Sequence, residues 1–263
     1  MASFSVFTKP WKETSPRELG VLVRGMGFDA LEFPLRPGYQ AEPQHAETEL
    51  PKLANLLAEE GVRIDSVASE LTPPVFAGCA KAGVGLIRTM FMPPAGEDYL
   101  VHEASFIAAL EKAVPLCEQS GVKVGLQMHY GTGATNTAEM MRIVGRFDPR
   151  FIGAVWDAAH SGFAGEAPEQ AIDLCWSHLC LVNFKNGFPC FMNRGADGEA
   201  RFRQYMVQGP DGLCPWPRAV RYLQKKAYSG TWCMPAEYDD CAPEQVEKYA
   251  SEDLIWLKKW VNG

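Results

Sequence analysis

The sequence has little that would tie it to a membrane or to a polyanion. No stretch of its 263 residues approaches the roughly 20 apolar residues of a membrane span. Its 25 Lys and Arg residues face 32 Asp and Glu residues, so the formal net charge is −7 and no basic surface for nucleic acid is indicated. The N-terminal segment meets Lys9 and Lys12 before a long apolar run develops, unlike a signal peptide. We therefore expect a cytoplasmic protein with no nucleic-acid or membrane partner.

Paired cysteines are also missing. The chain has eight cysteines, but none of them forms a CxxC pair, and several lie in apolar segments such as 172–181. A chain of this length buries enough apolar surface to be stable without covalent cross-links. The cysteines are therefore expected to be reduced and mostly buried, rather than part of a disulfide framework or a zinc site.

Short β-prone runs alternate with longer helical patterns along the whole chain. The expected strands are 4–7, 30–33, 64–68, 85–91, 122–128, 152–156, 180–184 and 231–236. The expected helices are 16–25, 50–60, 74–82, 104–119, 137–144, 168–176, 217–226 and 243–260. Ser15 and Glu18 provide the first helix with a capping pair around Pro16, and the helix is expected to close at Gly25 or Gly27.

These elements make eight strand–helix units of about 30 residues each, which implies a parallel sheet. The Gly-x-Gly-x-x-Gly turn of dinucleotide-binding sheets is absent, so a closed barrel is favoured and no nucleotide cofactor is expected. We predict a single (β/α)8 TIM barrel over residues 1–263. One connection, 187–217, is too long for an ordinary loop, and it is expected to be a lid or a subunit contact. The sequence leaves open whether the protein forms a homo-oligomer.

Polar side chains recur where the predicted strands end. They are Glu32, Arg36, Arg88, Gln127, His129, Asp157, His160, Asn183, Lys185, Asn186 and Glu237. Strands of a parallel barrel are usually apolar, so polar residues at their ends require a structural or functional explanation. For any one of them alone, a structural role at the rim, or in a salt bridge, is the better explanation. Because the carboxyl ends of the strands meet at one rim, however, their recurrence favours a shared binding cavity.

Five segments carry a resemblance to a known family. They are Gly27-Phe-Asp-Ala-Leu-Glu-Phe-Pro34, Gly121-Val-Lys-Val-Gly-Leu-Gln-Met-His129, Trp156-Asp-Ala-Ala-His160, Val182-Asn-Phe-Lys-Asn186 and Pro235-Ala-Glu-Tyr238. Their order and spacing resemble the sugar isomerase/epimerase superfamily with xylose-isomerase-like barrels. The resemblance covers the whole chain. It implies a divalent metal such as Mn²⁺ or Mg²⁺, held by Glu, Asp, His and Glu at the ends of strands five to eight.

Two of the four implied metal ligands differ from the family pattern. Asp157 and Glu237 match, whereas Gln127 stands in place of the first Glu and Asn183 in place of the His. The resulting set is all-oxygen with two ionised members. Amide oxygens suit hard cations such as Mg²⁺, but Mn²⁺ would lose a favoured imidazole ligand. We therefore expect weak binding, and the sequence leaves open whether Mg²⁺ or Mn²⁺ is bound at all.

The same departures limit the chemistry. Gln127 cannot accept a proton, so Glu237 is the one survivor of the two bases that the family uses. We expect the catalytic groups to be Glu237, Lys185 and His129, with Lys185 able to polarise a carbonyl in place of a metal. The expected substrate contacts are Glu32, Arg36, Arg88 and His160. Arg36 is positioned for an anionic or phosphorylated substrate, or alternatively for an ion pair with Glu32.

Three functions are compatible with these residues. The first is an isomerase or epimerase acting on a sugar, a sugar phosphate or a keto-polyol. The second is a metal-independent, lyase-like enzyme that uses Lys185 and Glu237 on an oxidised sugar. The third is a sugar-binding barrel without catalysis, whose metal site has decayed. A DNA-repair endonuclease of a related barrel type is disfavoured, because such an enzyme needs more histidine ligands and a basic face.

Overall fold

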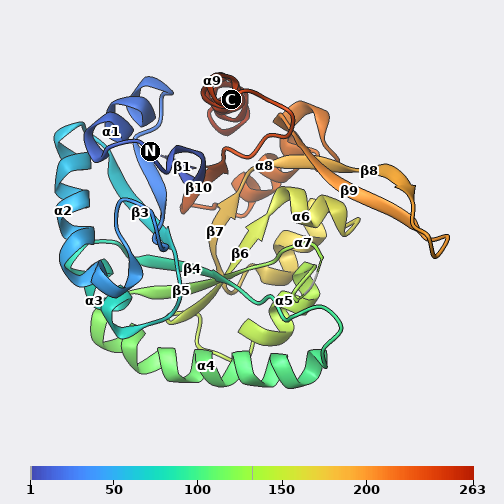
Figure 1. Ribbon diagram of the computed structural model, residues 1–263, viewed down its shortest axis with the longest axis horizontal. Helices are drawn as coiled ribbons and strands as arrows, with labels where there is room; N and C mark the ends of the chain where they lie inside the picture. The colour runs from blue at the N-terminus through green and yellow to red at the C-terminus, as the bar shows by residue number, and fades with distance from the viewer. Residues whose placement is uncertain (1, 132) are drawn as a thin grey trace.

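Eight parallel strands form a closed barrel with helices around it, as the sequence predicts (Figure 1). The computed structural model describes residues 2–131 and 133–263; residues 1 and 132 lie outside it. Neighbouring strands follow the order β1-β10-β7-β6-β5-β4-β3-β2, and β2 closes on β1. The barrel strands are β1 (Ser3–Phe7), β2 (Ala30–Pro34), β3 (Arg63–Ala68), β4 (Leu86–Met90), β5 (Lys123–Gln127), β6 (Ile152–Asp157), β7 (Leu179–Asn183) and β10 (Thr231–Pro235).

The outer helices largely follow the predicted pattern. They are α1 (Pro16–Gly25), α2 (Ala46–Glu59), α3 (Pro73–Ala82), α4 (Tyr99–Ser120), α5 (Thr137–Val144), α6 (Ala158–Phe163), α7 (Pro168–Cys175), α8 (Trp216–Lys225) and α9 (Pro243–Val261). Ser15 and Glu18 form the expected capping box. Helices α2 and α4 start four to five residues earlier than predicted, because their first turns are largely polar or exposed and show no apolar period. The short α6 was not predicted.

Alternation along the strands separates two apolar clusters. Residues that point outward, such as Val6, Ile87 and Val182, join the large core between the barrel and its helices. A smaller cluster comes from six different barrel strands and fills the interior. Its members are Phe7, Ala68, Leu86, Val155, Leu181 and Cys233. All eight cysteines lie within the described ranges as free thiols, and five of them are buried.

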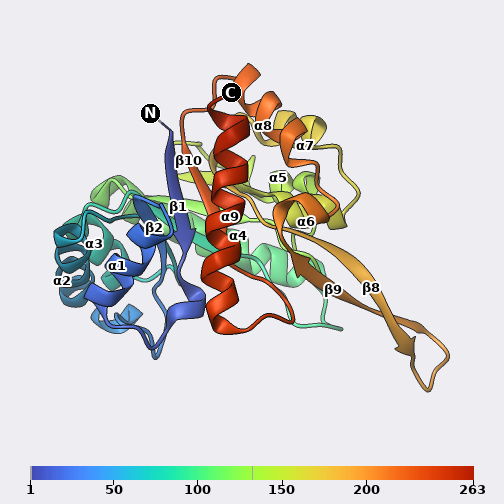
Figure 2. The same cartoon turned by 90° about the horizontal axis from the view of Figure 1, so that it is seen from above.

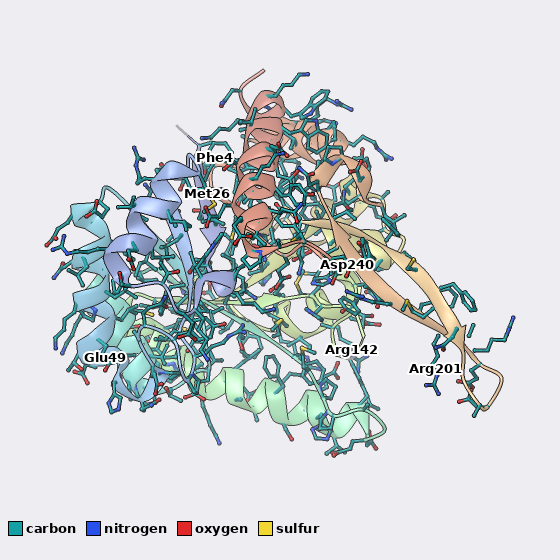
Figure 3. All side chains as sticks on the ribbon, turned by 45° about the horizontal axis from the view of Figure 1, so that its top comes forward. Phe4, Met26, Glu49, Arg142, Arg201 and Asp240 are labelled. Carbon is teal, nitrogen blue, oxygen red and sulfur yellow. The ribbon has the colours of Figure 1, made fainter. Side chains whose placement is uncertain are left out.

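The connection 187–217 is not the irregular loop that the sequence suggested. Most of it is an antiparallel hairpin of β8 (Asn186–Arg194) and β9 (Ala200–Val207), followed by a short 3-10 turn η3 (Gly209–Asp211). Cross-strand aromatic pairs, Phe188 with Tyr205 and Phe191 with Phe202, stabilise it. Figure 2 shows the hairpin projecting away from the barrel, and Figure 3 places Arg201 toward its outer end. In the part of the chain that is described, no helix combines the length and apolarity needed to span a bilayer.

Candidate active site

Two adjoining cavities lie at the carboxyl ends of the barrel strands. The inner cavity, of about 70 Å³, is lined by Phe7, Lys9, Arg36, Arg88, Met90, Gln127, His129, Asn183, Lys185, Pro235 and Glu237. The outer cavity, of about 630 Å³, opens between the barrel and the base of the hairpin, with Arg203 and Met206 of β9 in its wall. Lys9, His129, Lys185 and Glu237 border both cavities. Seven of the eleven predicted residues therefore meet at the inner cavity.

Lys185 lies between the two carboxylates of this site. Its Nζ donates to Glu237 Oε2 at 2.9 Å and lies 3.8 Å from Asp157 Oδ2. Lys9 Nζ donates to the other oxygen of Glu237 at 3.0 Å. Lys185 is 6% exposed and Asp157 is completely buried, so the attraction between their charges is little screened by water.

These charges shift the protonation equilibria of the site. Burial opposes the charged form of Lys185, but the Glu237 and Asp157 carboxylates outweigh that penalty and hold its pKa above the usual value. Lys185, with help from Lys9, holds the pKa of Glu237 well below its usual range. Burial raises the pKa of Asp157, although Lys185 opposes this effect. At neutral pH Lys185 is therefore an ammonium ion and Glu237 a carboxylate that accepts protons poorly.

A buried chain of polar side chains supports the floor of the inner cavity. Arg88 Nε donates to Glu32 Oε1 at 2.8 Å, and Arg88 Nη2 lies 2.8 Å from Glu32 Oε2. Its remaining nitrogen Nη1 donates to Gln127 Oε1, and Gln127 Nε2 donates to Asp157 Oδ2 at 2.7 Å. Arg88 also lies over the Phe7 ring. These contacts fix the orientation of Gln127, which presents an N–H group rather than an oxygen to Asp157.

The four side chains that the family pattern assigns to a metal do not fit a divalent cation. The oxygen of Gln127 accepts from Arg88, and the Asp157 and Glu237 carboxylates face the ammonium group of Lys185. A dication would have to displace Lys185 or lie beside its charge. Within residues 2–131 and 133–263, no three His, Cys, Asp or Glu side chains form a metal-binding group. We derive no step through a metal.

His129 lies at the border of both cavities, and only one of its ring nitrogens, Nδ1, forms a hydrogen bond within residues 2–131 and 133–263. Its Nδ1 is 2.8 Å from the Tyr130 carbonyl oxygen, so Nδ1 carries the hydrogen and Nε2 the lone pair. Burial, together with the charge of Lys185, lowers the pKa of His129. The imidazole is therefore neutral at neutral pH, as a proton acceptor must be.

A glycine turn holds His129 in place. Its backbone N–H donates to the Ala134 carbonyl at 2.8 Å, which closes the loop after β5. Gly133 in this loop has φ +91°, and a Cβ there would lie 1.9 Å from the Phe91 carbonyl oxygen. Only glycine can occupy that position. The loop is thereby pressed against the end of β4, with His129 at the cavity.

Three predicted site residues lie below or beside the cavities. Glu32 is completely buried and binds Arg88 and Ser66, so it supports the site from beneath. His160 is also completely buried, with Nε2 3.8 Å from Asp157 Oδ2 and its ring 4.2 Å from that of His129. Asn186 holds the base of the hairpin by donating to the Gly209 and Cys214 carbonyls, both at 2.8 Å. The substrate contacts expected of Glu32 and His160 are not available in this conformation.

Sequence reasoning missed Lys9, which contacts Glu237, and Arg203 in the wall of the outer cavity. A signal for Lys9 was present. At a strand end, the residue two positions after an inward-facing one lies at the rim of the cavity. His129 follows Gln127 in this way, and Lys185 follows Asn183. Phe7 and Lys9 follow the same rule at β1. Arg203 had no such signal, because the hairpin was not predicted.

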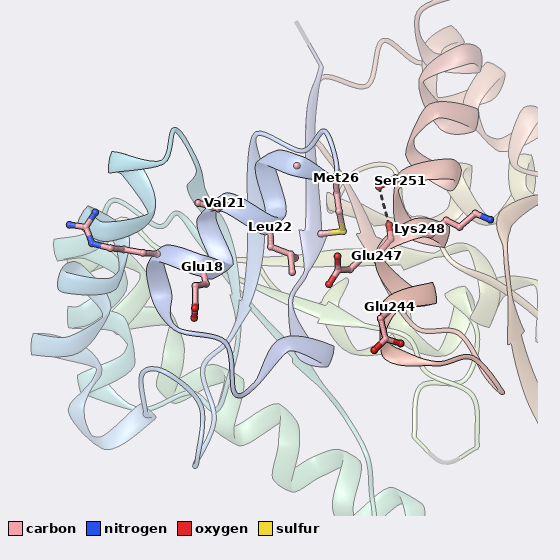
Figure 4. Close-up of a pocket in the computed structure, with 10 residues that line it drawn as sticks. Glu18, Val21, Leu22, Met26, Glu244, Glu247, Lys248 and Ser251 are labelled. Atoms are coloured by element: carbon pink, nitrogen blue, oxygen red, sulfur yellow. Dashed lines mark hydrogen bonds between the residues drawn. The ribbon is translucent and has the colours of Figure 1, made fainter.

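Another pocket, of about 610 Å³, lies on the outside of the barrel between α1 and α9 (Figure 4). Leu22 and Met26 line it from one side, and Glu247 and Ser251 from the other. None of the residues at the strand ends contributes to it. Its position away from the carboxyl ends of the strands makes it a poor place for barrel chemistry.

Asp253 of α9 links two segments next to the outer cavity. Its Oδ1 accepts from the Gly209 N–H at 2.9 Å, and its Oδ2 accepts from the Tyr238 hydroxyl at 3.0 Å. Burial raises the pKa of Asp253 to about 7, although both hydrogen bonds oppose the change. An unfolded chain would bind this proton only below about pH 4.

Replacing Asp253 by Asn is therefore expected to flatten the pH dependence of stability. The folded wild type holds the proton between about pH 4 and pH 7 and the unfolded chain does not, so this group makes stability fall as pH rises through that window, by at most about 4 kcal/mol. Thermal melts of both proteins from pH 5 to pH 8 test this. The melting temperature of Asp253→Asn should rise relative to that of the wild type as pH increases to about 7. Above that pH, the difference between the two melting temperatures should stay constant. A constant difference over the whole range would contradict the expectation.

Comparisons with known proteins agree with this architecture. Residues 76–260 match the family model described as xylose isomerase-like TIM barrel. Inosose dehydratase from Bacillus cereus (strain AH820) is 25% identical over 137 residues, which cover 50% of this chain and 46% of that protein. The chain therefore aligns with about half the length of such curated relatives.

Solved structures show the same fold at low identity. D-psicose 3-epimerase from Clostridium cellulolyticum H10, solved with D-tagatose, has a TM-score of 0.76 and 14% identity, over 98% of this chain and 99% of that one. The 3-keto-D-glucoside 4-epimerase of E. coli has a TM-score of 0.75 and 12% identity, over 98% and 100%. Because the family model covers well over half of its length, this chain belongs to the xylose isomerase-like TIM barrel family.

Proposed function

We propose that this protein is a metal-independent enzyme that removes a proton from the carbon next to the carbonyl of a keto-sugar or keto-polyol, with loss of water as the overall reaction. One observation carries the proposal. The ammonium group of Lys185 is held between Glu237 and Asp157 and borders the same cavity as the neutral His129. A fixed cation beside a neutral base is what enolisation of a carbonyl compound requires.

Each residue has a distinct task in this mechanism. Lys185 donates to the substrate's carbonyl oxygen and stabilises the negative charge that develops there. His129 Nε2 takes the proton from the neighbouring carbon, and the electron pair of the broken C–H bond moves to form the enolate. Glu237 and Asp157 keep Lys185 charged and in place. Glu237 acts as a positioning residue here, because two lysines occupy its oxygens.

Loss of water completes the reaction. The enolate re-forms the carbonyl and expels the hydroxyl group on the next carbon, and the protonated His129 returns its proton to that departing oxygen. One C–H and one C–O bond break, a C=C bond forms, and one water is released with no oxidant. The similarity to inosose dehydratases supports dehydration as the outcome.

The competing outcome is isomerisation. His129 would then return the same proton to the former carbonyl carbon, while the hydroxyl proton moves from one oxygen of the enediolate to the other, so that the carbonyl shifts by one carbon. This needs one carbon base and no second one. A single histidine whose Nε2 has no partner among the described residues favours this over epimerisation by two bases. The shared fold with sugar epimerases does not distinguish between the two outcomes, since their identity to this chain is only 12–14%.

Deuterium exchange tests the proposed function directly. The purified protein is incubated in D₂O with a panel of ketoses, keto-inositols and keto acids, with and without EDTA, and the products are followed by NMR. Deuterium at the carbon next to the carbonyl, in recovered substrate or in an isomerised product, reports enolisation that reverses or isomerises. A conjugated ketone, whose former C–H carbon keeps no hydrogen, reports enolisation followed by loss of water. We expect exchange that EDTA does not slow. Neither exchange nor a conjugated ketone with any compound, or reaction only with added divalent cation, would overturn the proposal.

Replacing His129 by Gln is expected to reduce the exchange rate by about 10²-fold or more, because the proton acceptor is lost. Glutamine fills part of the space that the imidazole ring occupies. In the wild type, kcat/KM should rise with pH through the lowered pKa of His129 and be level at pH 7. The variant should lose this rise. His45→Gln, in the short 3-10 turn η2 (Pro43–His45) outside both cavities, serves as the matched control. A wild-type-like pH profile in His129→Gln would exclude His129 as the base.

A further inference from the structure

Arg36 is a cation at the candidate active site that has no carboxylate partner among the described residues. It is half-buried and borders both the inner cavity and a neighbouring groove of about 320 Å³. Among the residues that the structure describes, it forms no ion pair, and its guanidinium group lies over the Phe7 ring, 5.7 Å from the centroid. The ion pair with Glu32 that the sequence suggested is made by Arg88 instead.

The surrounding charges do not compensate Arg36. Glu32 is taken by Arg88, and Glu237 is shared by Lys9 and Lys185. With Asp157, three carboxylates thus face four cations around the inner cavity, although the chain as a whole has a net charge of −7. Burial, with the nearby charge of Arg88, lowers the pKa of Arg36, as expected for a guanidinium group that lacks a counter-charge.

A second side chain at the same cavity also lacks partners. Asn183 is completely buried, and neither its Oδ1 nor its Nδ2 has a hydrogen-bond partner within the described ranges. Buried amide groups are almost always hydrogen-bonded, so an unpartnered one at a cavity marks a place for a ligand's polar group. Asn183 follows the inward register of β7, two residues before Lys185. It can therefore bind a substrate oxygen next to the one that Lys185 polarises.

We propose that the substrate is an anionic carbonyl compound whose carboxylate or phosphate is bound by Arg36, with a neighbouring oxygen on Asn183. That the bound anion is a substrate rests on the function proposed above. The presence of an anion-binding site at Arg36 does not depend on that function. The inner cavity, at about 70 Å³, accommodates only the reacting part of a substrate. The anionic group therefore lies at its edge, where Arg36 borders the wider groove. A guanidinium group can bind either anion through two parallel N–H···O bonds.

Binding of small probes tests this without any turnover. Dihydroxyacetone, pyruvate and dihydroxyacetone phosphate are all three-carbon ketones that carry no charge, a carboxylate and a phosphate, respectively. Dissociation constants are measured by NMR titration with the wild type, Arg36→Gln, Arg36→Lys and Arg201→Gln. Arg201 is the matched control, since it lies toward the outer end of the hairpin and its replacement changes the net charge equally.

At least one anionic ketone is expected to bind the wild type ten-fold or more tightly than dihydroxyacetone. Whichever of the two it is identifies the anion. Arg36→Gln should remove that preference, and Arg36→Lys should retain part of it, because the charge remains but the paired donors do not. Arg201→Gln should keep it.

Equal binding of all three ketones, or an unchanged preference in Arg36→Gln, overturns the proposal. Circular dichroism and a melting temperature near that of the wild type show that each variant is folded. Failure of this assay together with positive deuterium exchange would reject the anion site alone. Selective anion binding with no exchange would reject the proposed reaction alone.

Discussion

Replacing Lys185 by Met is expected to reduce deuterium exchange by about 10³-fold, the largest catalytic effect in this chain. The substitution removes the ammonium group that is held between Glu237 and Asp157 at the floor of the cavity. A preorganised donor at a developing oxyanion commonly contributes 10²–10³-fold to kcat, and a charged one in a buried site belongs at the upper end of that range. The exchange rate at saturating ketone, measured by NMR, checks this.

The same variant should gain affinity for divalent cations. Without Lys185, the buried Asp157 and Glu237 carboxylates repel each other, and Mg²⁺ or Mn²⁺ relieves that repulsion. Titration calorimetry with Mn²⁺ should show tighter binding to Lys185→Met than to the wild type. Lys9→Met is the control, since it removes the more exposed lysine on Glu237 and should lower exchange by less than about ten-fold. Activity of Lys185→Met within ten-fold of the wild type would reject the role given to Lys185.

Replacing Glu32 by Gln is expected to destabilise the fold by about 3–5 kcal/mol. Glu32 is completely buried and Arg88 is 4% exposed, so the substitution leaves the guanidinium charge without a counter-ion inside the barrel. Chemical unfolding in urea measures the loss. In a chain of this size, the melting temperature should fall by about 10 °C.

Two further variants test whether the loss of stability comes from the broken Glu32–Arg88 ion pair. Glu32→Gln combined with Arg88→Met removes both charges and should recover much of the stability, because no uncompensated charge stays buried. Glu47→Gln breaks an ion pair of similar length, 2.8 Å to Lys81, whose two side chains are both more than half exposed. It should cost at most about 1 kcal/mol. If the double variant were as unstable as Glu32→Gln, the buried charge would not be the cause.

Much of the fold follows from local features of the sequence. The alternation of β-prone runs with helical periods, and signals such as Ser15 with Glu18, predict eight strand–helix units and hence the barrel. The missed parts have local causes. The first turns of α2 and α4 show no apolar period. The strands of the hairpin have largely exposed side chains on both faces, so they lack the apolar alternation that predicts a strand.

The composition of the active site was also contained in the sequence. Polar residues at successive strand ends predict a shared cavity, and Arg88, Gln127, His129, Lys185 and Glu237 do line one. The sequence could not say which of them pair. Ion pairs depend on distances of 3–4 Å across the barrel, and such distances follow from strand register and closure rather than from the order of residues along the chain.

The sequence by itself thus determined that a parallel barrel forms and that its carboxyl end is polar, since strand periodicity and strand ends are local properties. Only the tertiary structure decided which charged and polar side chains pair with one another. It placed Lys185 between two carboxylates where the family pattern has a metal, and it paired Glu32 with Arg88. Among the described residues, it left Arg36 without an ion pair and the Asn183 side chain without a hydrogen bond. Closure of the barrel brings side chains from seven different strand ends within contact distance, and that proximity decides which charges are compensated.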